Sequence, residues 1–111
     1  LVDQVLATRP RPTAIVAAVD SVAALIYRAL AVRELRVGRD MSVISGNADH
    51  RLIAPLHPQL TTIDIHPFEI GRRAVQQLAL RLADPTPWPD GEWMVRPALL
   101  EGESVMTIDA K

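Results

Sequence analysis

Short apolar runs of strand length alternate along this chain with longer segments that have the periodicity of an amphipathic helix. The strand-like runs are 13–18 (TAIVAA), 41–45 (MSVIS) and 61–65 (TTIDI). The helix-like segments are about 21–35, 49–56 and 67–83. Unbroken apolar runs are typical of strands covered on both faces. The alternation therefore predicts an α/β fold, with a mostly parallel sheet and helices on both faces.

The predicted helix at 21–35 is apolar on two sides. Its main stripe is Val22, Leu25, Ile26, Ala29 and Leu30. A second, milder stripe is Ala24, Tyr27 and Ala31. Because such a helix packs against two things, we expect the main stripe to face the sheet. The second stripe is expected to face another helix or a second subunit.

Composition excludes several classes of protein. The 111 residues suffice for one small domain, and 12 basic and 13 acidic side chains are mixed along the chain, so no basic face for nucleic acid is expected. The absence of cysteine excludes disulfides and thiolate metal sites. The spacing of His50, His57 and His66 matches no zinc motif, so no metal or cofactor is predicted. No nucleophile elbow, phosphate-binding glycine cluster or membrane-length apolar run is present, so neither an enzyme nor a membrane protein is expected.

Polar side chains follow the predicted strands where a parallel sheet binds ligands. Asp20 comes after the first run, Asn47 after the second, and Asp64 lies on the third. Because ligands bind beyond the carboxyl ends of such strands, these three are the candidate ligand-binding residues. Alternatives stay open: Asp20 as the N-cap of the following helix, Asn47 as a turn residue beside Gly46, and Asp64 as a solvated or hinge residue.

Three segments resemble one family when taken in order. They are 11–20 (RPTAIVAAVD), 37–44 (VGRDMSVI) and 60–63 (LTTI), with Gly71 and Ala74 downstream. From Arg11 onward the chain is similar to the effector-binding domain of the LacI/GalR family of bacterial transcription regulators. It also looks like the related sugar-binding proteins of ABC transporters.

The resemblance implies the C-terminal half of a two-lobed, periplasmic-binding-protein-like type I fold. Residues 1–60 are then expected in the C-terminal lobe, 61–92 as a crossover strand and helix of the N-terminal lobe, and 93–111 as the return to the C-terminal lobe. The apolar stripe of the long helix, Ala74 to Leu82, is expected to pack against a lobe that is largely absent from this chain. Any DNA-binding helix-turn-helix would also lie outside this chain.

The implied function is the ligand-sensing and dimerisation part of a cytoplasmic LacI-type regulator, with a sugar or nucleoside-like effector in the cleft between lobes. The resemblance also implies a homodimer through Ala24, Tyr27, Ala31 and the loop near His50–Leu56, and DNA contact only through another domain. One alternative is a periplasmic sugar-binding protein of an ABC transporter. A small doubly wound enzyme domain is a further alternative, weakened by the missing catalytic residues.

Three positions depart from the pattern of the family. Val19 stands where relatives often have a ligand-contacting Asn, Asn47 where they have an acid, and Gly102 where they often have Arg. These departures argue against a simple sugar effector. They are consistent with a different ligand or with a receptor that has lost its ligand.

Overall fold

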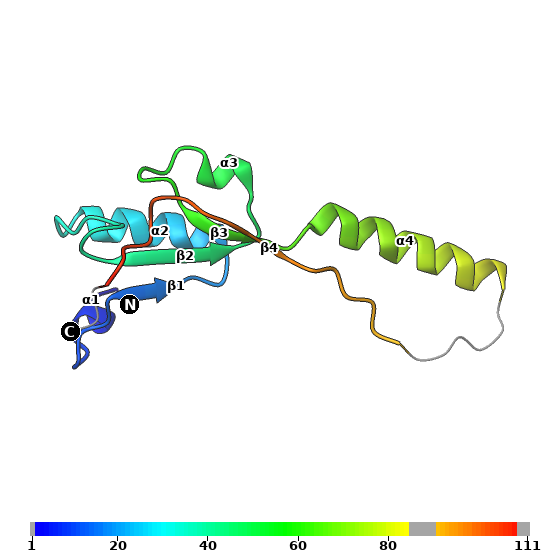
Figure 1. Cartoon of the computed structure of the whole chain (residues 1–111), viewed down its shortest axis with the longest axis horizontal. Coiled ribbons are helices and arrows are strands. Elements are labelled where there is room, and N and C mark those ends of the chain that lie inside the picture. The colour runs from blue at the N-terminus through cyan, green and yellow to red at the C-terminus, as the bar shows by residue number, and fades with distance from the viewer. Residues whose placement is uncertain (1, 85–90, 109–111) are drawn as a thin grey trace.

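Four strands form a single sheet in the order β1-β2-β3-β4 (Figure 1). The computed structural model describes residues 2–84 and 91–108. The strands are β1 (Ala14–Val16), β2 (Ser42–Gly46), β3 (Thr61–Asp64) and β4 (Ala98–Leu100). The first three are mutually parallel, and β4 runs antiparallel to β3. The mostly parallel sheet expected from the sequence is therefore confirmed.

Three of the four helices pack together, and the fourth leaves the sheet. The helices are α1 (Val2–Ala7), α2 (Asp20–Ala31), α3 (His50–Ile53) and α4 (Pro67–Ala83). α2 lies against β2, and both α1 and α3 contact α2. α4 projects away from the sheet (Figure 1), and none of its residues is buried. In the described residues, no helix has the length and apolarity needed to cross a membrane.

α2 ends four residues earlier than the periodicity predicts. Glu34 has a φ of 58°, and the amide of Leu35 donates to the carbonyl of Leu30 over 3.0 Å. A left-handed residue with this six-to-one hydrogen bond is a Schellman-type helix end. The apolar pattern continues to Leu35, but the helical conformation of the backbone ends before it.

The buried core lies between α2 and one face of the sheet. α2 contributes Ala23, Ile26, Tyr27 and Leu30, and the other buried apolar residues are Ala17, Met41, Val43, Ile53 and Leu60. The predicted main stripe is therefore wrong in two members, because Val22 and Leu25 are 37% and 66% exposed. The helix is rotated by one position, so that Ala23 packs closely on the sheet and Tyr27 turns inward.

The opposite face of the sheet is apolar and exposed in the part of the chain that the structure describes. Val16 is 77% exposed, and Ile63 faces the same way as its cross-strand neighbour Leu99. The run at 13–18 was predicted to be covered on both faces, and the described residues cover it on one. α4 likewise leaves its predicted stripe, including Val75 and Leu78, in solvent. These are the surfaces that a second layer of helices covers in a parallel α/β sheet.

The return segment holds the sheet together at its amino end. Ser104 is fully buried. Its carbonyl accepts the Val43 amide over 2.9 Å, and its hydroxyl donates to the Val43 carbonyl over 2.6 Å. The same hydroxyl oxygen accepts the Thr61 amide over 2.8 Å. The sequence also predicts a strand from about Trp93 into Leu99–Leu100, but β4 begins only at Ala98, because the preceding Pro97 has no amide hydrogen for the ladder. The stretch 88–91 (WPDG) also predicts a turn, and most of it lies outside the described residues. The assignment of segments to lobes stays a prediction.

The close approach of Gly102 to β3 generates a stability prediction. A Cβ at this position would overlap the Gln59 carbonyl oxygen and lie 2.8 Å from the Leu60 carbonyl carbon. We expect Gly102→Ala to lower the free energy of unfolding by about 2 kcal/mol, because backbone atoms would have to move. Gly71→Ala is the matched control, since nothing lies within 4 Å of its Cβ position. It should be neutral or stabilising by up to about 1 kcal/mol in the same denaturant titration. Equal stability of the two variants would contradict this reading.

Candidate functional site

The side chain of Asp20 joins four elements at the carboxyl end of the sheet. Asp20 begins α2 and is only 1% exposed. Its Oδ1 accepts hydrogen bonds from the Ser45 hydroxyl of β2 over 2.5 Å and from the Thr62 hydroxyl of β3 over 2.9 Å. Its Oδ2 accepts the backbone amide of Asp49, just before α3, over 2.6 Å. The three donors come from segments that are 25 to 42 residues away in sequence.

The interpretation of Asp20 as the N-cap of α2 is wrong. Val19 is the N-cap residue, with an extended backbone, and no side-chain hydrogen bond caps the helix. The carboxylate of Asp20 is directed at the sheet and the α3 loop instead. A capping aspartate and this buried one look the same in sequence, because both stand at the first turn of a helix after a strand.

A hollow of about 580 Å³ opens beside this cluster, where ligands bind in parallel α/β sheets. The start of α2, the loop after β2, α3 and the segment after β3 all line it. The lining residues are Val19, Asp20, Ser21, Asn47, Ala48, Asp49, His50, Arg51, Leu52, Ile65 and Pro67. Two of the three predicted site residues, Asp20 and Asn47, are thus brought together.

Asn47 is both a turn residue and a lining residue. Its φ of 96° lies in the left-handed region, and Ala48 follows with a φ of 57°. Asn adopts this region more readily than most residues, which explains its place here. The amide of Asn47 donates to the carbonyl of Ile63 over 2.9 Å and fixes the turn to β3. The two interpretations of Asn47 are therefore compatible.

Asp64 lies outside the lining of the hollow. Its Oδ1 accepts the backbone amide of His66 over 2.7 Å, and its Oδ2 is 3.1 Å from Nδ1 of the same histidine. His66 has a φ of 53° and stands between β3 and α4. Asp64 thus stabilises the bend where α4 leaves the sheet, which supports the hinge interpretation. A ligand contact for Asp64 stays a prediction.

Charge at the rim of the hollow is locally balanced. The Arg51 guanidinium lies 3.0 Å from Oδ2 of Asp49. Hydrogen bonds from the Arg51 side chain and backbone hold the pKa of the Asp49 carboxyl below its usual range. Among the described lining residues, the polar groups suit hydrogen bonding to a neutral molecule. No group of three metal-ligating side chains is found in the described ranges.

Sequence reasoning missed Ser45 and Thr62 as members of the cluster. Both are buried hydroxyl residues in strands that are otherwise apolar. A hydroxyl inside a predicted core strand needs a hydrogen-bonding partner, and this was the signal available in the sequence. The third donor, the backbone amide of Asp49, could not be predicted from the sequence, because a backbone amide is not specific to a residue type.

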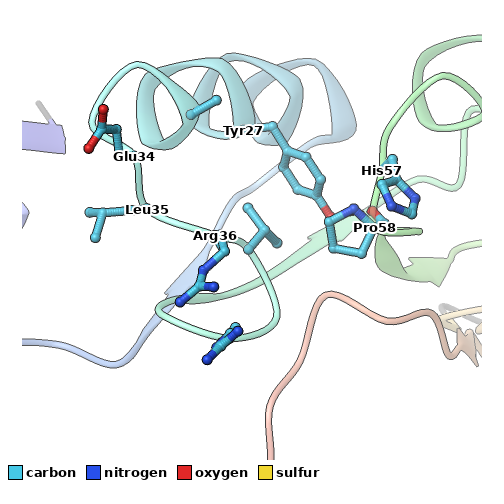
Figure 2. Close-up of a pocket in the computed structure, with 9 residues that line it drawn as sticks. Tyr27, Glu34, Leu35, Arg36, His57 and Pro58 are labelled. Carbon is cyan, nitrogen blue, oxygen red and sulfur yellow. The ribbon is translucent and has the colours of Figure 1, made fainter.

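A second hollow, of about 520 Å³, lies between the end of α2 and the turn at His57-Pro58 (Figure 2). Tyr27 and Ala31, two of the residues predicted to face a partner, line it. Tyr27 is only 8% exposed, and its hydroxyl donates to the Pro58 carbonyl over 3.0 Å. Burial raises the pKa of the Tyr27 phenol above its ordinary value. Tyr27 therefore belongs mainly to the core.

The sheet order, the packing of α2 on one face of the sheet and the hollow at the strand ends are the features of a domain of the periplasmic-binding-protein type. The family model for the periplasmic binding protein-like domain matches residues 1–105. Within that class, the chain belongs to the LacI family of transcriptional regulators, as part of an effector-binding domain.

Relatives with names and structures agree with this assignment. The chain is 37% identical over 83 residues to the ribose operon repressor of Escherichia coli, covering 75% of this chain and 25% of the relative. A LacI family regulator from Bifidobacterium animalis is 32% identical, with a TM-score of 0.79 over 94% of this chain and 37% of that one. A LacI family regulator from Enterococcus faecalis with bound ribose is 29% identical, with a TM-score of 0.84 over 97% of this chain and 39% of that one. The chain thus spans about a quarter of the length of the curated relatives.

The hydrogen bond between Tyr27 and Pro58 generates a second stability prediction. Tyr27→Phe keeps the ring in the core and leaves the Pro58 carbonyl without its donor. We expect a loss of about 1 kcal/mol in the free energy of unfolding, measured by thermal or chemical denaturation. Leu25→Ala, at a residue 66% exposed on the same helix, should cost less. A larger loss for Leu25→Ala would show that the assigned core face of α2 is wrong.

Proposed function

We propose that this chain is the ligand-sensing and dimerising part of a LacI-type transcriptional regulator that binds a sugar or nucleoside-like molecule. The observation that carries the proposal is the hollow at the carboxyl ends of β1 and β2, lined by Asn47, Ser21 and the buried Asp20. Hydroxyl and amide groups at fixed positions recognise sugar hydroxyls by hydrogen bonding. The bound ribose in one relative and the names of the ribose repressors support this ligand class.

The departures from the family pattern refine the proposed ligand. Val19 and Ile65 give the hollow an apolar wall, and Asn47 offers a neutral amide where relatives carry an acid. Gly102 lies outside the lining of the hollow, and its close approach to the Gln59 carbonyl leaves no room there for the arginine that the resemblance implies. The departures argue against a simple sugar, yet the walls of the hollow accept a neutral ligand with both hydroxyl groups and an apolar face, and this class includes a pentose as well as a nucleoside.

In the proposed regulator, the effector closes the two lobes, and a dimer passes this change to a DNA-binding domain outside the chain. This assigns the protein to the cytoplasm and gives it no catalytic role. The alternative of a transport receptor shares the same fold. The relatives compared above are repressors and regulators by name, which favours the regulator.

Binding of D-ribose to the native protein tests the proposal, with adenosine and D-glucose as comparison ligands. Asn47→Gly removes the side-chain amide and keeps the left-handed backbone without strain. We expect its Kd, measured by isothermal titration calorimetry, to rise about tenfold, since a polar ligand group would lose its partner.

Gln4→Ala, which removes an exposed amide on α1, is the control and should leave the Kd unchanged. A Kd within twofold of wild type for Asn47→Gly would remove this residue from the site. No binding of any of the three ligands by the wild-type protein would contradict the proposed ligand class.

We further propose that a second copy packs on α2 around Ala24 and Ala31 and on the loop near His50–Leu56. Ala31 is exposed at the end of α2, whereas Tyr27 is buried and belongs to the core beneath this surface. Ala31→Arg should weaken the dimer at least tenfold in sedimentation equilibrium, because a long charged side chain would be desolvated in the interface. The matched control is Ala7→Arg, at an exposed position on α1. If both variants dimerise like wild type, the interface lies elsewhere.

A further inference from the structure

The turn that carries Asn47 is held at both ends by hydrogen bonds. At one end, the Asn47 amide donates to the Ile63 carbonyl over 2.9 Å. At the other end, the Asp49 amide donates to Oδ2 of Asp20 over 2.6 Å. Between them, Asn47 and Ala48 both have positive φ angles, of 96° and 57°. Two consecutive left-handed residues without glycine are unfavourable by themselves, so this turn depends on the contacts that hold it.

Asp20 lines the hollow, but its carboxylate is engaged in hydrogen bonds within the protein. Its side chain is 1% exposed, and both carboxylate oxygens already accept hydrogen bonds. Ser45 and Thr62, which donate to Oδ1, fix the carboxylate to the sheet. Oδ2 is then directed at the one donor that belongs to the lining of the hollow, the amide of Asp49.

We propose that Asp20 is a positioning residue for the ligand site: it acts through the Asp49 amide to hold the 46–49 turn, and with it the Asn47 side chain, against the hollow. Ser45 and Thr62 anchor Asp20 and have no direct part in placing the turn. The inference rests on the proposed function in one respect, that the turn contacts the ligand. The mechanical part, that Asp20 orders the turn, holds without a ligand.

Hydrogen–deuterium exchange of the native protein tests the mechanical part. In Asp20→Ala, the amides in peptides covering 46–49 should exchange about tenfold faster, because the hydrogen bond that orders the turn is lost. Asp20→Asn should restore most of the protection, since its amide oxygen can still accept from Asp49. Ser45→Ala and Thr62→Val should lower Tm and leave exchange in the turn close to that of wild type.

A merely structural role for Asp20 gives a different pattern. In that case, Ser45→Ala would speed exchange in the turn as much as Asp20→Ala does at the same loss of Tm, and the proposal would be overturned. Should Asp20→Ala fail to fold, the same comparison is made in the Ser45→Ala/Thr62→Val background, which leaves no hydroxyl without a partner. Unchanged exchange in the turn on adding Asp20→Ala to that background would also overturn it.

A ligand measurement separates this inference from the proposed function. With D-ribose as the probe, Asp20→Ala should raise the Kd about as much as Asn47→Gly, and the two substitutions together should add little more. If wild type binds no ribose while Asp20→Ala still loosens the turn, the proposed ligand fails and the positioning role stands. Additive effects of the two substitutions on the Kd would show that Asp20 acts independently of Asn47 and would overturn the coupling.

Discussion

The buried carboxylate of Asp20 is the interaction on which the arrangement of the site depends. Taking a carboxylate out of water costs several kcal/mol unless hydrogen-bond donors replace the water. Here Ser45, Thr62 and the Asp49 amide supply those donors. Each comes from a different segment, so the cost is offset only when β2, β3 and the turn before α3 are all in register. The polar cluster therefore specifies how the strand ends meet, and these strand ends form the hollow.

The apolar surfaces of the chain impose a second constraint. α2 and the sheet bury one core, whereas α4 and the far face of the sheet leave Val16, Val75, Leu78 and Leu82 exposed within the described residues. Exposed apolar patches of this kind mark surfaces that other parts of a protein cover. The curated relatives are about four times as long as the matched segment, so most of each relative lies outside it. The stability of the native protein is expected to depend on covering these surfaces.

Periodicity in the sequence was sufficient to predict the sheet and the order of its elements, because apolar strands and an amphipathic helix have distinct spacings. It did not predict which face of α2 is buried. Val22 and Leu25 are large and apolar like Ile26, but the face that is buried carries the small Ala23 and Tyr27, whose hydroxyl donates to Pro58. Asn47 could be placed in the site because its position relative to β2 is local. The role of Asp20 could not, since its donors are brought together only by the folded sheet.

The hydrogen bonds of Asp20 also indicate which substitutions the site should tolerate. Val19 and Asn47 line the hollow, and the side chain of neither hydrogen-bonds to Asp20. Residues that line the hollow can therefore change with the ligand while the buried cluster keeps the strand ends in place. A change at Ser45 or Thr62 would instead leave a buried oxygen of Asp20 with fewer donors, which is costly whatever the ligand. We therefore expect ligand specificity to depend on the lining residues, and the geometry of the lining to depend on the buried carboxylate of Asp20.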